Sequence, residues 1–322
     1  FIISIKFTTK VKILSTFESR KKQRELNEKL IKFALISAAA ISILTTFGIL
    51  FSILFEAIEF FKLRSFWYFL TGSTWTPGVI DSQFGALPIF AGTFVITVIA
   101  LGVAIPIGLG SAIYMSEYAS SKLRDYLKPI LEVLAGIPSV VYGFFAAITV
   151  APLIVKAAAA IGLEATFNSA LASGIVMGIM IIPTISSLSD DVIRSVPDSQ
   201  RKASFGLGMT HGETIRDIVL PSAMPGIISA SLLALSKALG ETMVVVMAAG
   251  LRPNLSWNPL EDMTTVTVTI VNALVGDFEF SSPETLSAFA LGLVLFVVTL
   301  ILNMISLSLI RKFKEKYKVN TL

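Results

Sequence analysis

The chain contains no cysteine and only one histidine, His211. The lack of cysteine excludes a disulfide framework, a thiolate metal site and a thiol nucleophile, and one histidine cannot build a histidine-rich metal site. The sequence also lacks a GxxxxGK[ST] phosphate-binding loop and any Ser-His-Asp set that a single histidine could serve. We therefore expect no catalytic residues, no metal and no cofactor, and any ATP hydrolysis that powers the chain must take place on another polypeptide.

Charge is also scarce. Only 15% of the 322 residues are charged, 54% are hydrophobic, and the mean hydropathy is +0.79. Six apolar runs of about 20 residues or more fit transmembrane helices. One run alone could be a buried core helix, but six together argue against a soluble fold. We predict an all-α integral membrane protein with transmembrane helices near residues 33–55, 87–115, 127–155, 169–188, 227–250 and 286–310.

The positive charge is concentrated at the two ends of the chain. Residues 1–32 carry nine lysines and arginines, and residues 311–322 carry five. Basic segments beside membrane helices stay in the cytoplasm, and six spans place both ends on one side. Both termini are therefore predicted to be cytoplasmic in a multi-pass protein of the inner or plasma membrane. The net charge of +4 follows from this topology and does not indicate nucleic-acid binding.

These patterns divide the chain into four parts. Residues 1–32 form a basic cytoplasmic arm, which either lies on anionic lipid of the bilayer or is a disordered tail. Residues 33–86 hold the first transmembrane helix and an outer loop, residues 87–310 hold the other five helices, and residues 311–322 form a basic tail. In a second outer segment, the Thr/Val run at 264–269 is either a short strand or an interfacial helix.

Two opposite charges lie deep in the run at 227–250. Lys237 and Glu241 are one helical turn apart, and a charge at the bilayer centre costs at least a few kcal/mol, roughly. Lysine before glutamate is the weaker order for a pair on a helix surface, so local helix stability explains the pair poorly. The pair indicates either an ion pathway or a structural contact between helices across a subunit interface.

The longest inner loop, residues 189–223, is polar but has the pattern of two short helices. Pro197 suits a first helical position, and that helix should stop near Gly206 or Gly208. Thr210 and Glu213 have the spacing of a capping box, which predicts a second helix that ends at Pro221. This loop is either a docking surface or merely an ordered connection.

The same loop resembles the "EAA" loop of ABC importer permeases. The matching residues keep the family spacing and lie before the fifth span; they are Lys202, Ala203, Ser204, Gly208, Leu220 and Pro221. The chain departs from the family pattern at Lys202, where glutamate is usual, and at Ser204, where alanine is usual. The resemblance implies that this loop couples the permease to an ATPase.

Further motifs resemble phosphate-importer permeases of the PstC type. They are Trp-Thr-Pro at 75–77, Phe-Gly-Ala-Leu-Pro at 84–88, Gly-Ile-Pro-Ser-Val-Val-Tyr-Gly at 136–143 and Ala-Leu-Gly-Glu-Thr-Met at 238–243. The resemblance covers residues 65 to 312 and implies the type I ABC importer permease fold. It also implies partners: a homologous permease of the PstA type, two ATPase subunits on the cytoplasmic face and a phosphate-binding protein on the outer face.

The resemblance also implies a substrate pathway. Lys237 stands where the family usually has arginine and would offset phosphate charge, while Glu241 would hold Lys237 in place. Thr242, Ser139 and Tyr142 complete the candidate pathway, although the hydroxyls of Ser139 and Tyr142 could equally serve helix packing. An importer permease for sulfate or molybdate is the closest alternative. A secondary transporter would more often show repeated halves, and none is visible here.

Overall fold

The computed structural model describes residues 2–79, 81–275, 279 and 281–316, with side chains described from residue 27 to residue 312 within those ranges. The chain divides into two parts, residues 1–55 and 56–322, each described here by itself. The first part belongs to the long helix α1 (Ile2–Leu63), which continues into the second part. The backbone of the predicted arm, residues 2–32, is helical, and its side chains up to residue 26 lie outside the described ones.

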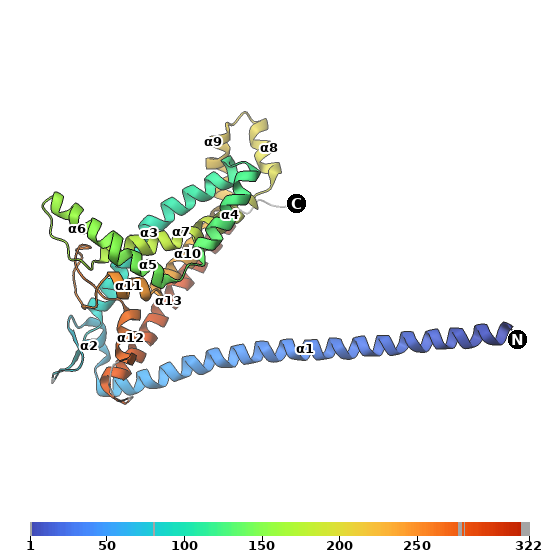
Figure 1. Ribbon diagram of the computed structural model, residues 1–322, viewed down its shortest axis with the longest axis horizontal. Coiled ribbons are helices and arrows are strands. Elements are labelled where there is room, and N and C mark those ends of the chain that lie inside the picture. The colour runs from blue at the N-terminus through green and yellow to red at the C-terminus, as the bar shows by residue number, and fades with distance from the viewer. Residues whose placement is uncertain (1, 80, 276–278, 280, 317–322) are drawn as a thin grey trace. The chain divides into compact units, whose positions relative to one another are not determined.

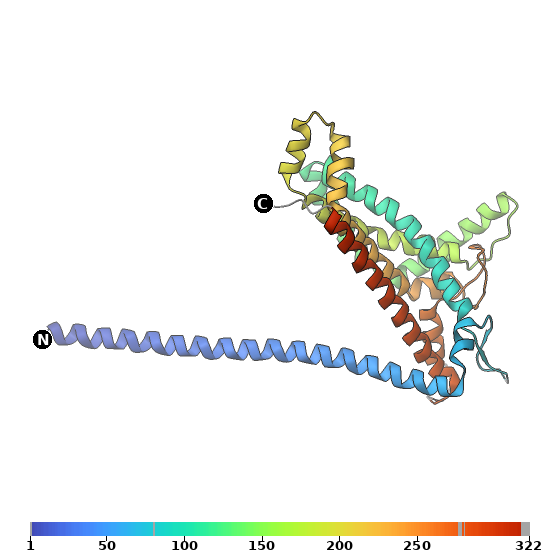
Figure 2. The same ribbon diagram turned by 180° about the vertical axis from the view of Figure 1, so that it is seen from behind.

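The prediction of six membrane helices is confirmed. Within the described residues, six helical stretches are long and apolar enough to cross a membrane, with the bounds Asn27–Leu63, Leu87–Tyr118, Ser139–Ala160, Ala170–Arg194, His211–Leu239 and Pro283–Lys312. In the second part, α8 and α9 lie at one end and α2 and α12 at the other (Figures 1 and 2). The fold is all-α apart from one small hairpin in the described chain.

That hairpin and a short helix follow α1. Helix α2 spans Phe66–Thr71, and strands β1 (Trp75–Thr76) and β2 (Gln83–Phe84) pair antiparallel, with Trp75 opposite Phe84. The rings of Phe60, Phe69, Trp75 and Phe84 meet edge to face at centroid distances of 5.4–6.3 Å. Such pairs contribute about 0.5–1.5 kcal/mol each beyond their buried area. The aromatic cluster therefore joins the β1–β2 hairpin to α2 and to the end of α1.

Helices α3 (Leu87–Ile113) and α7 (Ala170–Arg194) form the centre of the second part. They approach closely because α7 carries small residues: a Cβ on Gly174 would lie 2.7 Å from Ile99 Cγ2, and one on Gly178 would lie 2.8 Å from the Ala100 carbonyl oxygen. The GxxxG pair of α7 thus serves packing within the chain. Helix α3 ends in a π-helical turn, η1 (Tyr114–Tyr118).

The prediction of one helix over the third apolar run, 127–155, was wrong. The structure has α4 (Ser121–Ala135), then a break, then α5 (Ser139–Phe145), the π-helical turn η2 (Ala146–Val150) and α6 (Ala151–Ala160). The break falls at Gly136 and Pro138. Proline lacks the N–H that a continuing helix needs and disfavours the helical region for the residue before it.

The fifth apolar run, 227–250, is also not one helix. Helix α10 (Leu220–Leu239) ends at Gly240, and α11 (Met243–Ala248) begins three residues later. The prediction that the second loop helix ends at Pro221 was wrong. Helix α9 (His211–Thr214), the π-helical turn η3 (Ile215–Val219) and α10 continue into one another. Pro221 follows the π-helical turn η3 almost directly, and prolines and π-bulges are the usual irregularities within a continuous helix.

The Thr/Val run contributes to a helix and not to a strand. Helix α12 spans Val266–Val275, and the Thr93 hydroxyl of α3 accepts a hydrogen bond from the Val266 N–H at 3.0 Å. The last helix, α13, spans Pro283–Lys316. Of the predicted basic tail, residues 317–322 lie outside the described residues.

One glycine of α3 should be sensitive to a single added methyl group. A Cβ at Gly92 would lie 2.2 Å from the Thr264 carbonyl oxygen, whereas a Cβ at Gly102 of the same helix meets nothing within 4 Å. We expect Gly92→Ala to destabilise the protein by about 1–3 kcal/mol through overpacking, and Gly102→Ala to be neutral or stabilising by up to about 1 kcal/mol. Thermal unfolding of the purified variants measures the difference, and equal midpoints would contradict the close contact.

Candidate functional site

The break between α4 and α5 carries two residues of the predicted pathway. Ser139 is the first residue of α5 and is half-buried. The Tyr142 hydroxyl donates a hydrogen bond to the Leu134 carbonyl oxygen at 3.0 Å and so bridges the end of α4 to α5. This hydrogen bond joins two helices of the chain, and the place of Tyr142 in a substrate pathway stays a prediction.

The other three residues of the predicted pathway lie at or next to the break between α10 and α11. Lys237 is exposed in the last turn of α10, whereas Glu241 and Thr242 lie in the break and are half-buried. Among the described residues, the ion pairs within 4.0 Å do not include Lys237 with Glu241. The prediction that Glu241 holds Lys237 across one helical turn was therefore wrong, because the helix ends between them.

Glu241 is used locally instead. Its Oε1 accepts a hydrogen bond from the Val244 N–H at 3.2 Å, and its carbonyl oxygen accepts one from the Thr267 hydroxyl at 2.9 Å. The N–H groups at a helix start have no partners within the helix and attract a carboxylate. Thr242 bonds weakly to the Gly240 carbonyl, at 3.4 Å. Glu241 thus fixes the start of α11 and leaves Lys237 without its predicted partner.

Helix packing brings the two breaks near each other. Helix α5 lies on α11, where a Cβ on Gly143 would meet Met247 Sδ at 2.9 Å and the Met243 carbonyl oxygen at 3.0 Å. Ser139 and Tyr142 therefore belong to the same helix that supports α11, which begins directly after Glu241 and Thr242. The structure shows no direct hydrogen bond between the two groups among the described residues.

The predicted coupling loop forms a compact helical hairpin. Helix α8 spans Asp198–Gly206, Gly208 has a φ of +83°, and α9 begins with the predicted capping box of Thr210 and Glu213, which the structure confirms. Ser204 is buried and shares a 2.9 Å hydrogen bond with Thr214. The hairpin is therefore closed by a polar contact between its two helices.

The other residues of the predicted loop motif lie on or near the surface of this hairpin. Lys202 and Ala203 are exposed on α8, while Leu220 and Pro221 are half-buried at the start of α10. A surface groove of about 380 Å³ lies between α8 with its following turn and the stretch from η3 into α10, lined by Gln200, Ala203, Ser204, Leu207, Met209, Asp217, Ile218, Pro221 and Ser222. Leu207 at its edge is 83% exposed, so the hairpin presents apolar surface away from its own chain.

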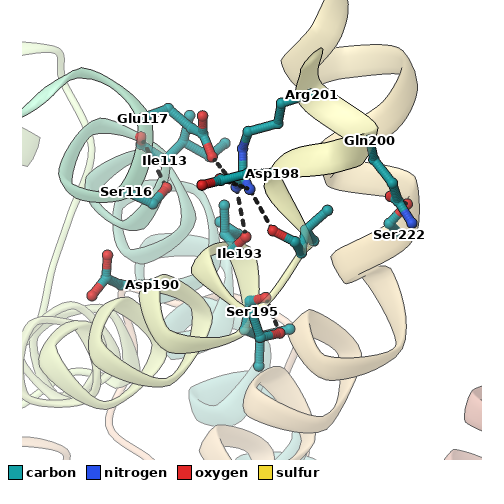
Figure 3. A network of polar contacts seen from close by, with 12 residues as sticks. Ile113, Ser116, Glu117, Asp190, Ile193, Ser195, Asp198, Gln200, Arg201 and Ser222 are labelled. Atoms are coloured by element: carbon teal, nitrogen blue, oxygen red, sulfur yellow. Dashed lines mark hydrogen bonds and ion pairs between the residues drawn. The ribbon is translucent and has the colours of Figure 1, made fainter. Parts of the chain in front are cut away.

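Two ion pairs at the base of the hairpin were not predicted (Figure 3 shows the first). Arg201 Nη2 lies 2.8 Å from Glu117 Oε1, and Arg124 Nη2 lies 2.7 Å from Asp190 Oδ2. The hydrogen bond that Arg124 donates to Asp190 raises the pKa of Arg124 above its ordinary value. The partners in each pair are 84 and 66 residues apart in sequence. Nothing in the local sequence pairs residues at such separations.

Within the described residues, no group of three histidines, aspartates or glutamates lies together as a metal site. The polar contacts described above join helices to one another. The arrangement is suited to transmitting movement. Two broken membrane helices pack together, and the α8–α9 hairpin is joined to the ends of α3 and α7 by the Arg201 guanidinium and the Glu117 carboxylate.

Comparisons with known proteins agree with this architecture. Residues 104–316 match the family of binding-protein-dependent transport system inner membrane components. A probable ABC transporter permease protein, YqgH of Bacillus subtilis, is 36% identical over 251 residues, which cover 78% of each chain. The phosphate transport system permease protein PstC of Mesorhizobium japonicum is 36% identical over 287 residues, covering 82% of this chain and 84% of that protein.

Solved structures show the same fold. The bacterial alginate ABC transporter, in complex with an alginate pentasaccharide-bound periplasmic protein, matches with a TM-score of 0.57 at 15% identity, covering 85% of this chain and 92% of that chain. The MetNI methionine ABC transporter in an inward-facing conformation matches with a TM-score of 0.53 at 15% identity, covering 69% of this chain and 93% of that chain.

The chain therefore has the type I ABC importer permease fold and belongs to the family of binding-protein-dependent transport system inner membrane components. It is a multi-pass membrane subunit. Membership of this family implies an ABC transporter assembly, in which a substrate-binding protein and an ATPase accompany the membrane subunit.

Proposed function

We propose that this chain is the PstC-type membrane subunit of an ATP-driven importer of inorganic phosphate. The support comes from relatives named as phosphate permeases: PstC of Mesorhizobium japonicum at 36% identity, and PstC 1 of Mycobacterium tuberculosis at 32% identity over 80% of this chain. In this proposal the chain makes and breaks no covalent bond. It alternates between two packings that open to opposite sides of the membrane, and ATP binding to partner subunits biases that equilibrium.

The proposed assembly has three kinds of protein partner. A homologous permease of the PstA type pairs with this chain in the bilayer, and two ATPase subunits bind on the cytoplasmic side. The hairpin of α8 and α9 docks on one of the ATPases, supported by its exposed Leu207 and its surface groove. A phosphate-binding protein docks at the opposite end. Both termini are cytoplasmic in this proposal, as the basic residues at the two ends favour.

The main support for an anion pathway is the surroundings of the Lys237 side chain. It is an exposed cation on an apolar membrane helix and forms no ion pair with any described residue of its own chain. A charge in a membrane helix normally faces a partner or a water-filled cavity. The negative charge that Lys237 needs must then come from outside this chain, either from a passing anion or from the partner permease.

Replacing Lys237 tests whether uptake depends on this cation. We expect Lys237→Ala to lower phosphate uptake by about tenfold or more, since a charge-assisted hydrogen bond is worth roughly 1.5–3 kcal/mol. Lys237→Arg should retain most uptake. Lys156→Ala is the control, because Lys156 is also an exposed lysine on an apolar helix, α6. Uptake of labelled phosphate by proteoliposomes that hold the assembled transporter measures the effect.

The same vesicles test the alternatives. Uptake of sulfate or molybdate in preference to phosphate would show that the proposed substrate is wrong and that the transporter class is right. Uptake by the isolated chain on a proton or sodium gradient, without ATPase subunits, would indicate a secondary transporter. Wild-type phosphate uptake in Lys237→Ala, at equal amounts of assembled complex, would remove Lys237 from the pathway.

A further inference from the structure

Glu117 is attached to both helices of the α8–α9 hairpin. Its carboxylate accepts from Arg201 of α8 at 2.8 Å, and its backbone carbonyl oxygen lies 3.2 Å from His211 Nε2 at the start of α9. Glu117 itself lies in η1, the last turn of the α3 helical run. One residue at the end of a membrane helix is therefore held from two sides by the hairpin.

Arg201 extends this contact to a second membrane helix. Its Nη2 also donates to the Ile193 carbonyl oxygen at 3.0 Å, and its Nη1 donates to the Val196 carbonyl oxygen (Figure 3). Ile193 lies in the last turn of α7, whose final carbonyl groups have no partner within the helix. A single guanidinium thus connects the hairpin, the end of α3 and the end of α7. Only arginine has the fixed, forked set of donors that allows this.

These contacts are largely shielded from solvent. The Arg201 and Glu117 side chains are 16% and 6% exposed, and a cluster of Ala112, Ile193, Val196, Val219, Ala223 and Ile227 lies at the same end of the helices. A surface pair of this kind would be screened and would move freely, but a buried pair is costly to separate. The hairpin should therefore not slide relative to α3 and α7 while this pair is intact.

The hairpin is also internally rigid, and α3 and α7 pack closely. Ser204 and Thr214 join α8 to α9, and a Cβ on Gly108 of α3 would lie 2.9 Å from Ile185 Cβ of α7. A displacement applied to the hairpin would reach both helices at one point. From there the displacement would pass along the packed helices α3 and α7 toward the opposite side of the membrane.

We propose that the Arg201–Glu117 pair is the mechanical link that transmits movement of the hairpin to α3 and α7. The inference rests on the proposed function, in which the hairpin docks on an ATPase. Arg201 and Glu117 are positioning residues, since they act through the helices that they hold. A link of this kind does not set how fast ATP is hydrolysed, but it does set how much transport each hydrolysis event yields.

The test is the ratio of phosphate imported to ATP hydrolysed, in proteoliposomes that hold the full transporter. In Glu117→Gln, which keeps the side-chain shape and loses the charge, we expect this ratio to fall about tenfold, while ATPase activity stimulated by the binding protein stays within about twofold. Arg201→Lys keeps the charge and loses the forked geometry, so an intermediate ratio is expected.

The control is Lys128→Gln, which breaks the partly exposed Lys128–Asp191 pair at the same end. An unchanged ratio in Glu117→Gln, whether the two rates hold or fall together, would overturn the proposal.

A distance measurement tests the link without any assumption about the substrate. The chain has no native cysteine, so spin labels attached at Ile107→Cys on α3 and Ser199→Cys on α8 before assembly would be the only ones on this chain, and both residues are exposed. In the assembled transporter we expect one narrow distance distribution that is the same with and without bound ATP analogue, and a broader one in Glu117→Gln. A distance that changes with nucleotide in the otherwise unaltered chain, or no broadening in Glu117→Gln, would contradict the link. Because this readout needs no transported anion, it stays valid if phosphate proves to be the wrong substrate.

Discussion

Gly208→Val should lower both ATPase assembly and phosphate uptake by about tenfold or more, whereas Gly206→Val should have little effect. The two glycines are two positions apart in the same hairpin, and a Cβ at either would meet nothing within 4 Å. They differ in backbone conformation. Gly208 has a φ of +83°, whereas Gly206 is the last residue of α8 and has no positive φ.

The positive φ follows from how α8 ends. The Gly208 N–H bonds to the Phe205 carbonyl at 3.0 Å, and the Met209 N–H bonds to the Ser204 carbonyl at 3.3 Å. This pair of bonds is the Schellman motif, which requires a left-handed residue just after the helix. A non-glycine residue there costs roughly 1–2 kcal/mol, and a β-branched residue costs more. The capping box at Thr210 follows directly, so no residue between the two helices can adjust its backbone to accommodate a different conformation at position 208.

The measurement is the amount of ATPase that co-purifies with the chain, together with uptake in vesicles. Gly206→Ala and Gly208→Ala form the milder matched pair: the first should be neutral or stabilising, because alanine is the better helix former, and the second should be partly defective. Full assembly and wild-type uptake in Gly208→Val would show that the hairpin does not depend on this turn.

The hairpin also shows how far the sequence alone could predict this fold. The glycine and the capping box are local features, so their spacing predicted where α8 ends and α9 begins. The six membrane helices were equally predictable because each needs only a long apolar run. The hairpin of β1 and β2 was not predicted, since each strand has two residues and depends on the aromatic cluster around Phe60 and Phe84.

The helix breaks and the buried charges show where sequence reasoning stopped. Hydropathy is continuous through 127–155 and 227–250, so it could not reveal the interruptions at Pro138 and Gly240. Glu241 was paired with Lys237 because both were placed on one helix; the free N–H groups of α11 compete for its carboxylate instead. The Arg201–Glu117 and Arg124–Asp190 contacts join distant segments, which only the folded chain brings together. The role of the Lys237 group in transport stays a prediction.

Asp190→Ala should be strongly destabilising, and its neighbour Asp191→Ala should not. Asp190 is fully buried in α7 and receives hydrogen bonds from Arg124 Nε at 3.1 Å and Nη2 at 2.7 Å. Asp191 is 53% exposed and pairs with Lys128. Removing one partner of a buried pair leaves an uncompensated charge and costs about 3–5 kcal/mol. Exposed pairs contribute about 0–1 kcal/mol.

Unfolding midpoints of the purified protein measure the difference, which should be roughly 10 °C for a chain of this size. Most of the loss comes from the Arg124 charge, which then keeps only the longer contact of its Nη2 with Asp191 Oδ1 at 3.9 Å. Arg124→Met combined with Asp190→Leu should therefore be much more stable than Asp190→Ala alone. A double variant as unstable as Asp190→Ala would show that the geometry of the α4–α7 contact, and not its charge balance, stabilises this end of the helices. Equal midpoints for Asp190→Ala and Asp191→Ala would contradict the burial of the pair itself.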